Sequence, residues 1–189
     1  MEGLTEAAQA LCDGGLVLLP TDTVAGLAAR PESVQALCRA KGRTAGAPFS
    51  WLFDSPLEIL AWWEPTCFPP AGLDELWTLP VTLVLPGAPR SPWTSPPSSG
   101  PWGLGVRLGA PPWLARLALE AGTPYLLTSA NVHGDPAPKS VEEASIRIKE
   151  SVAFSMDGPP GSGTPSSVVA WTPEGPHVLR GSAPPALFS

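Results

Sequence analysis

Apolar residues along this chain occur in short runs that end abruptly in small polar side chains, and residues 124–131 show this pattern most clearly. The apolar segment Tyr125–Leu127 is followed directly by Thr128, Ser129 and, after one alanine, Asn131. Buried strands of open α/β sheets deliver hydrogen-bonding groups to ligand sites in this way. Because these three side chains donate and accept hydrogen bonds without carrying charge, we expect them to hold a polar ligand.

Apolar residues at helical spacing predict several helices. Thr5 is expected to cap the first helix, which ends at Gly14, and Ser140 is expected to cap the last one, with Glu143 three residues later. Between them, the pattern predicts helices over residues 32–41, 57–63 and 112–121.

Short apolar runs predict strands between these helices. The predicted strands cover residues 16–19, 51–53, 81–85, 104–108, 152–155, 167–171 and 177–179, and a further strand begins at Pro124. The proline-rich segment 86–101 is predicted to be a loop that cannot join a sheet, either a mobile flap or a plain connection. Helices and strands alternate without internal repeats, so we expect one α/β domain over residues 1–189. Its sheet should be open, twisted and mixed, with helices flanking it.

Composition and charge narrow the classes of function. The hydrophobic fraction of 43% and the charged fraction of 15% are those of a globular protein. The formal charge of −6 disfavours a general nucleic-acid-binding surface. A local basic patch is still available, because Lys41, Arg43, Arg107 and Arg180 could converge from distant parts of the chain.

Cysteine and histidine usage excludes other classes. The three cysteines are scattered without a Cys-x-x-Cys pair, which disfavours a disulfide framework and a zinc ribbon. With two histidines in the chain, no metal-ligating residue is predicted. The acidic N-terminus does not resemble a signal peptide, and no apolar run is long enough to span a bilayer. We therefore expect a cytoplasmic protein with no membrane partner.

Lys41 and Arg43 form a candidate anion clamp at the end of a predicted helix. Arg offers a bidentate fork for phosphate or carboxylate, and Lys offers a point charge. The alternative is helix capping, with Lys41 in the last turn and Gly42 just beyond it. The segment alone leaves both interpretations open.

Thr21, Asp22 and Thr23 follow a predicted strand directly, where open sheets bind ligands. Asp22 could orient a substrate amine or a Mg²⁺ ion, but the three residues could equally cap a turn. Ser129 does not lie in a Gly-x-Ser-x-Gly elbow and has no evident orienting acid, which disfavours a serine nucleophile.

The glycine-rich segment 158–164 has the glycine spacing of a phosphate loop. Thr164 stands where the essential lysine belongs, and prolines remove backbone donors, so this is not a Walker motif. A turn, or a binding loop that leads to Ser166 and Ser167, fits the segment better.

Taken in order, these segments resemble the YrdC-type (TsaC) family of L-threonylcarbamoyladenylate synthases. The matching segments are Pro20-Thr-Asp-Thr-Val-Ala-Gly-Leu27, Lys41-Gly-Arg43 with Pro48, Pro80-Val-Thr-Leu-Val-Leu85, Val106-Arg107, Thr128-Ser-Ala-Asn131 with Gly134, Ser166-Ser-Val-Val169 and Leu179-Arg180. The resemblance covers nearly the whole chain and implies the single-domain form of the family, with an open α/β fold and a concave, positively charged substrate cleft.

The resemblance also implies an activity. ATP, L-threonine and bicarbonate would yield threonylcarbamoyl-AMP and pyrophosphate, with Mg²⁺ accompanying ATP. The product would serve the t6A modification of tRNA through downstream threonylcarbamoyl transferase proteins, and direct tRNA binding is left open.

The resemblance further implies roles for individual residues. Lys41, Arg43 and Arg180 would face phosphates or carboxylates, and Lys41 and Arg43 are the predicted catalytic pair. Thr21 would contact threonine, and Asp22 and Thr23 belong to the same binding segment. Thr82 and Arg107 would line the floor. The nucleotide would be held by Thr128, Ser129, Asn131 and Ser167, and Ser166 is a further predicted substrate- or ATP-binding residue.

Several positions depart from the family pattern. Ala25 replaces the usual tyrosine, the Trp-Pro-Gly-Pro segment is reduced to Trp77-Thr-Leu-Pro80, Pro111 stands where the family has histidine, and His133 replaces a serine. The alternative interpretation is a paralogue that binds nucleotide or tRNA, either without catalysis or with another acceptor.

Overall fold

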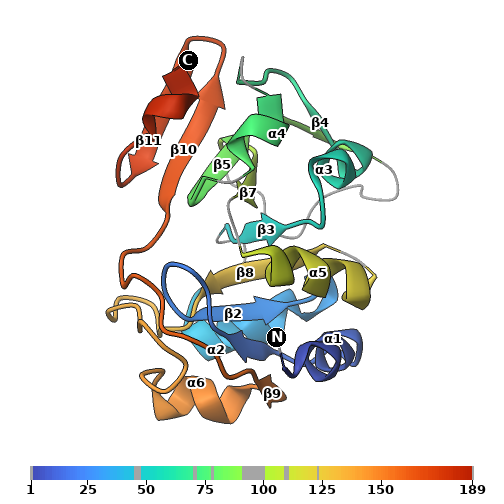
Figure 1. Cartoon of the computed structure of the whole chain (residues 1–189), viewed down its shortest axis with the longest axis vertical. Helices are drawn as coiled ribbons and strands as arrows, with labels where there is room; N and C mark the ends of the chain where they lie inside the picture. The colour runs from blue at the N-terminus through green and yellow to red at the C-terminus, as the bar shows by residue number, and fades with distance from the viewer. Residues whose placement is uncertain are drawn as a thin grey trace.

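A nine-stranded mixed β-sheet organises the chain (Figure 1). The computed structural model describes residues 2–44, 48–69, 72–77, 79–90, 101–108, 111–122 and 124–188. The strands of the sheet are β1 (Val17–Leu19), β2 (Gly26–Ala29), β3 (Ser50–Leu52), β5 (Val81–Leu85), β7 (Leu104–Arg107), β8 (Tyr125–Ser129), β9 (Phe154–Ser155), β10 (Ser167–Thr172) and β11 (Gly175–Arg180). Their order is β11-β10-β5-β7-β3-β8-β2-β1-β9, which confirms the predicted α/β class.

Helices flank this sheet. They are α1 (Leu4–Cys12), α2 (Val34–Lys41), α3 (Pro56–Trp62), α4 (Gly72–Leu76), α5 (Pro112–Ala121) and α6 (Ile146–Ser151), with short 3-10 turns at Pro31–Ser33 and Pro185–Phe188. Helices α1 and α5 pack side by side, and α2 contacts α6 (Figure 1). No described helix is long and apolar enough to cross a membrane.

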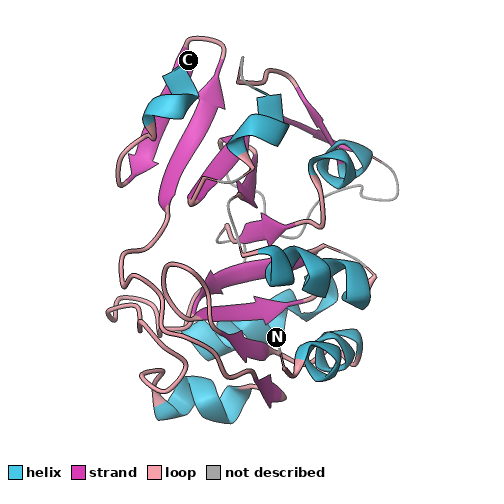
Figure 2. Ribbon diagram, in the orientation of Figure 1, coloured by secondary structure: helices cyan, strands magenta, loops and turns pink. Residues whose placement is uncertain are grey.

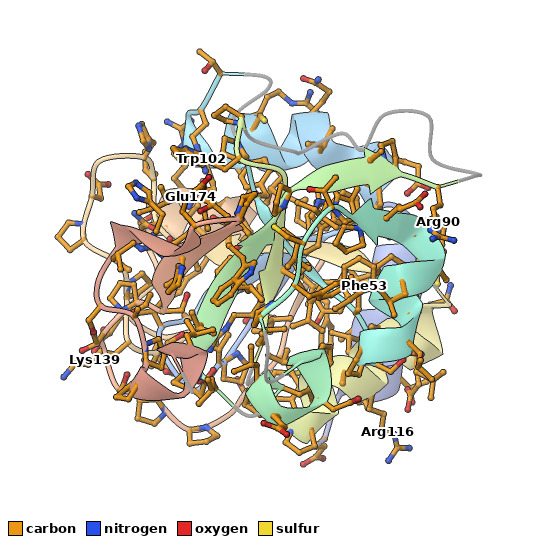
Figure 3. All side chains as sticks on the ribbon, turned by 90° about the horizontal axis from the view of Figure 1, so that it is seen from above. Phe53, Arg90, Trp102, Arg116, Lys139 and Glu174 are labelled. Carbon is orange, nitrogen blue, oxygen red and sulfur yellow. The ribbon has the colours of Figure 1, made fainter. Side chains whose placement is uncertain are left out.

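Two apolar clusters hold the helices to the sheet, and β1 shows how one strand serves both. Val17 and Leu19 pack with α1 and α5, whereas Leu18 between them packs with the cluster that includes α2 and α6. This division follows from the two-residue period of a strand. Phe53 lies inside the molecule, while charged side chains such as Arg116 reach outward (Figure 3).

Strand β2 was not predicted from the sequence, although it pairs antiparallel with both β1 and β8. Three of its four residues, Gly26, Ala28 and Ala29, are small and have little β propensity. All four are buried, so pairing on both sides and burial on both faces determine this strand. Because Gly26 at the start of β2 pairs with Ser129 at the end of β8, the β1–β2 connection, which contains Thr21–Val24, lies next to the end of β8.

The predicted start of the last helix at Ser140 is wrong. Helix α6 begins at Ile146 after Ser145, and residues 140–144 form turns. The Glu143 carboxylate accepts a hydrogen bond from the Lys139 backbone N–H at 2.8 Å, and this contact closes a turn instead of capping Ser140. The first helix also begins earlier than predicted, after Gly3 instead of Thr5.

The prediction that segment 86–101 stays outside any sheet is also wrong in part. Gly87–Pro89 (β6) pairs antiparallel with Trp63–Pro65 (β4) in a separate two-stranded sheet. Its prolines are tolerated because they lie at strand ends of an isolated pair, which needs few ladder bonds. The question of a flap falls on residues 91–100, which lie outside the described residues.

Glu58 lies in the first turn of α3 and is half-buried. Its carboxylate accepts a hydrogen bond from the Asp54 N–H at 2.8 Å, and its own N–H donates to Ser55 Oγ at 3.3 Å. Burial raises the pKa of Glu58 to about 7, and the nearby Asp54 charge adds to this rise, although the Asp54 N–H opposes it.

We therefore expect Glu58→Gln to remove a pH dependence of stability. Because the folded-state pKa of Glu58 lies above its unfolded value, its stabilising contribution is complete below about pH 4.5 and is lost as pH rises through about 7. As pH rises from 5 to 8, the free energy of unfolding of the variant, measured with urea, should increase by about 1–2 kcal/mol relative to that of the wild type, after allowance for solvent screening. A constant difference across this range would contradict the assignment.

Candidate functional site

A cavity of about 530 Å³ lies where the loops after β1 and β8 meet the ends of β5, β7, β10 and β11. These loops gather on one side of the molecule (Figure 2). Among the predicted site residues, those that line the cavity are Thr21, Thr23, Arg43, Thr82, Arg107, Thr128, Ser129, Asn131, Ser166 and Arg180. Asp22, Lys41 and Ser167 are not among its lining residues.

Strand register explains why residues so far apart in sequence converge. Thr82 on β5 lies opposite Arg107 on β7 and beside Val168 on β10. Val168 in turn lies opposite Arg180 on β11. Arg107, Thr82, Val168 and Arg180 therefore form one row across four strands, and we call its two arginines and its threonine the polar row.

Arg107 is the most buried cation of this row. It is 4% exposed, and its Nη2 donates to Oδ1 and Oδ2 of Asp22 at 2.7 and 2.8 Å. Its Nη1 is buried and has no hydrogen-bond partner within the described part of the chain. Asp22 thus supports an arginine of the cavity instead of facing a ligand, and one buried donor of Arg107 still lacks an acceptor.

Arg180 is fixed from behind by a backbone carbonyl. Its Nε and Nη2 donate to the oxygen of Ser166 at 3.3 and 2.9 Å. Burial lowers the pKa of Arg180, and the positive charge of Arg107 lowers it further. Two guanidinium groups that repel each other across a cavity favour binding of an anionic ligand between them.

Arg43 supplies a third cation from the end of α2. Its guanidinium carbon lies 4.9 Å from the centre of the Phe49 ring, a cation–π contact that orients the side chain. Burial lowers the pKa of Arg43, as expected for a cation partly removed from water.

Lys41 does not face the cavity. The side chain is 3% exposed, and its Nζ donates to the backbone oxygen of Ser129 and to the backbone oxygen of Asn131 at 2.8 Å. Gly42 adopts a left-handed conformation at φ 63° and ends α2, so the capping interpretation holds for this glycine. The predicted clamp is therefore divided: Arg43 lines the cavity, and Lys41 supports the end of β8.

The polar end of β8 forms a closed network. Ser129 Oγ donates to Asn131 Oδ1, and Asn131 Nδ2 donates to the oxygens of Val132 and Asp135 at 3.0 and 2.7 Å. The Ser129 hydroxyl therefore orients Asn131, which agrees with a binding role. Ser167 lies elsewhere: its Oγ accepts the Ser182 N–H at 3.1 Å.

Thr21 and Thr23 combine both interpretations left open by the sequence. Thr21 Oγ1 donates to the Val24 oxygen at 2.6 Å and accepts the Thr23 N–H at 3.1 Å, as in a capped turn. The same two residues also line the cavity.

Sequence reasoning missed other lining residues, among them Ser50, Phe49, Trp102 and Asp135. Thr82 Oγ1 lies 3.4 Å from Ser50 Oγ and 3.3 Å from Ser166 Oγ, which forms a chain of hydroxyls. No spacing in the sequence marks these positions, because three segments that are far apart in the chain contribute them.

The positions that depart from the family pattern lie away from the cavity wall. Ala25 is fully buried, with its N–H on the Pro138 oxygen and its own oxygen on the Ala130 N–H. Ala25, Pro111 and His133 are not among the lining residues. Thr78, within the reduced tryptophan segment, lies outside the described residues.

The described residues contain no group of three or more His, Cys, Asp or Glu placed to hold a metal ion. Both carboxylate oxygens of Asp22 accept hydrogen bonds from Arg107, so they are not free to bind a metal ion. The carboxylate of Asp135 lines the cavity. A Mg²⁺ ion in such a cavity would depend mainly on oxygen ligands supplied by a bound phosphate.

Comparison with known proteins identifies the family. Residues 9–182 match the Sua5/YciO/YrdC family, whose description is "Telomere recombination". The chain belongs to this family. Members similar in sequence include a putative threonylcarbamoyl-AMP synthase of Mycobacterium tuberculosis, 33% identical over 188 residues, covering 94% of this chain and 83% of the relative. A threonylcarbamoyl-AMP synthase of Xylella fastidiosa is 30% identical over 184 residues, covering 94% and 96%.

Solved structures of the Sua5/YciO/YrdC family share the fold. P. abyssi Sua5 complexed with L-threonine matches with a TM-score of 0.80 and 26% identity, covering 94% of this chain and 53% of the Sua5 chain. This chain therefore spans about half the length of that protein. E. coli YciO matches with a TM-score of 0.73 at 19% identity, covering 94% and 87%, which supports the fold alone.

Lys41 should titrate near pH 8, which gives a testable pH dependence. Burial, and then the charge of Arg43, lowers the pKa of Lys41 from 10.5 to about 8. Between these values the unfolded chain binds more protons, so stability should rise with pH. Measured by urea denaturation, the free energy of unfolding of the wild type should rise by up to about 3 kcal/mol relative to that of Lys41→Met between pH 8 and 10.5. A difference that stays flat would place the Lys41 ammonium in solvent.

Proposed function

We propose that this chain synthesises L-threonylcarbamoyl-AMP from L-threonine, bicarbonate and ATP, with release of pyrophosphate. The observation that carries the proposal is a cavity with three arginines and several uncharged hydroxyl groups, in which Ser129 is engaged with Asn131. Such a site binds and orients anionic reactants without a covalent intermediate on the protein. The names of the relatives from M. tuberculosis and X. fastidiosa support the same activity.

The proposed reaction proceeds in two steps. The threonine amine attacks bicarbonate and forms a carbamate with loss of water; if bicarbonate first loses hydroxide as water to give CO₂, the amine adds to CO₂ and releases a proton. A carbamate oxygen then attacks the α-phosphorus of ATP, and the bond to the β-phosphate oxygen breaks to release pyrophosphate. Both steps bring anions together, so neutralisation of charge and orientation supply most of the acceleration.

In this proposal the residues divide by location. Arg43, Arg107 and Arg180 neutralise phosphate and carboxylate charge, and Thr21 contacts threonine. The nucleotide is held by Thr128, Ser129, Asn131 and Ser166. Among the lining residues, the Asp135 carboxylate would be available to hold Mg²⁺ beside the bound phosphates, where the ion would supply neutralisation of charge. The product then passes to threonylcarbamoyl transfer onto tRNA.

Pyrophosphate release tests this proposal directly. The wild-type chain with ATP and Mg²⁺ should release pyrophosphate only when both L-threonine and bicarbonate are present. Release with bicarbonate but with a different amine would indicate another acceptor. ATP binding in calorimetry without any release would indicate the non-catalytic paralogue.

Arg43→Ala should lower turnover by about a hundredfold or more, because a charged group in a preorganised site commonly contributes a few kcal/mol to transition-state binding. Arg39→Ala is the matched control, since Arg39 is exposed in the last turn of α2, shortly before Arg43, and is not among the cavity residues. Steady-state rates at saturating ATP distinguish the two. Equal rates for both variants would remove Arg43 from the chemistry.

A further inference from the structure

The connection between β9 and β10 crosses the molecule. Strand β9 is the last strand at one edge of the sheet, whereas β10 is second from the opposite edge. The connecting chain runs along the side of the molecule where the site loops gather, from the lower strands to β10 (Figure 1). We call residues 158–166 of this connection the strap.

The strap is hydrogen-bonded through its backbone to the loop that carries Asp22. The backbone N–H of Ser162 donates to the backbone oxygen of Asp22 at 3.0 Å. The backbone N–H of Gly163 donates to the backbone oxygen of Thr23 at 2.8 Å. The N–H of Gly161 donates to the oxygen of Lys139 at 2.9 Å, which fixes the strap on its other side. Two consecutive donors, Ser162 and Gly163, therefore hold the backbone of the Asp22–Thr23 loop, and Gly161 anchors the strap itself.

Close approach requires glycine at position 161. A Cβ built there would lie 2.3 Å from the Thr23 oxygen and 2.9 Å from the Thr21 oxygen, well inside any real contact. Gly161 is not in the left-handed region, so contact distance and not backbone angle imposes the glycine. The obstructing atoms belong to the backbone and cannot rotate away.

The far end of the strap fixes the second arginine. The backbone oxygen of Ser166, in the strap, accepts both hydrogen bonds from Arg180. Asp22, whose backbone the strap holds, accepts both hydrogen bonds from Arg107 through its carboxylate. One segment therefore supports both guanidinium groups of the polar row, although their like charges oppose this proximity.

We propose that the strap is a positioning element that sets the separation of Arg107 and Arg180, so that both guanidinium groups bind the same polyphosphate. The inference rests on the proposed function only in taking ATP as the ligand. Gly161 and Ser162 do not touch the ligand; they act through Asp22 and Arg107.

Two variants disturb the strap in different ways. Gly161→Ala forces it away from Thr21 and Thr23, and Ser162→Pro removes the N–H that Asp22 accepts. Ser162→Ala is the matched control, because it retains that N–H and removes only the long hydroxyl contacts with Thr164 at 3.3 and 3.4 Å. Gly122→Ala is the control for general destabilisation, since Gly122 has φ 69° at the end of α5 and is not among the cavity residues.

Calorimetry with ATP and with inorganic tripolyphosphate should show about tenfold weaker binding for Gly161→Ala and Ser162→Pro, and unchanged binding for both controls. The effects of Arg107→Lys and Arg180→Lys on the free energy of ATP binding should be strongly non-additive in the wild-type background. In the Gly161→Ala background the two effects should be close to additive. In the wild-type chain itself, saturating ATP should slow hydrogen exchange at the Ser162 and Gly163 amides.

Unchanged ATP affinity in either folded strap variant, or unchanged amide exchange in the wild type, would overturn the inference. Equal weakening in Gly122→Ala would overturn it as well, because the effect would then be global. If ATP binding depends on the strap but the wild-type chain forms no product, the proposed synthase activity is contradicted and the role of the strap is supported. If the wild-type chain forms product but the strap variants bind ATP normally, the synthase activity is supported and the role of the strap is contradicted.

Discussion

The ion pair between Asp22 and Arg107 is the interaction on which the site depends. It joins the β1–β2 loop to β7 across the centre of the sheet, with both carboxylate oxygens on one guanidinium nitrogen. A buried charge of this kind is tolerated only when its partner is held firmly. The Asp22 backbone is held by the strap and Arg107 by the strand register, so the pair is fixed from two directions.

The charged residues around the cavity fall into two groups with different tasks. Asp22 and Lys41 are supports: one holds Arg107, and the other holds the carbonyl groups at the end of β8. Arg43 and Arg180 face the cavity, and each is oriented by a contact with its surroundings, the Phe49 ring or the Ser166 oxygen. A site arranged in this way has its charges oriented before substrate arrives, which is what electrostatic catalysis requires.

Local signals in the sequence were sufficient for much of this fold. The strand at Val81–Leu85 and the helix at Pro112–Ala121 were predicted with their observed bounds, because a continuous apolar run and a proline at the first helical turn are local features. Strand β2 could not be found in the same way, since its small residues become a strand only through pairing with β1 and β8.

The site shows the same division between local and tertiary information. Polar residues directly after apolar strands were identified as ligand-binding candidates, and Thr21, Thr128 and Ser129 line the cavity. The direction of the Lys41 side chain was not predictable, because it depends on where β8 ends relative to α2. The contribution of Trp102 was likewise hidden, since its neighbour His177 comes from a distant strand, with ring centres 5.1 Å apart.

Mass spectrometry of the product shows whether this cavity joins a threonine carbamate to AMP. With ¹³C-bicarbonate, ATP, Mg²⁺ and L-threonine, we expect a threonine–AMP adduct that carries one additional labelled carbonyl carbon. An adduct without the label would indicate direct aminoacyl adenylation and would rule out the carbamate route, as would the absence of any adduct in the presence of bound ATP.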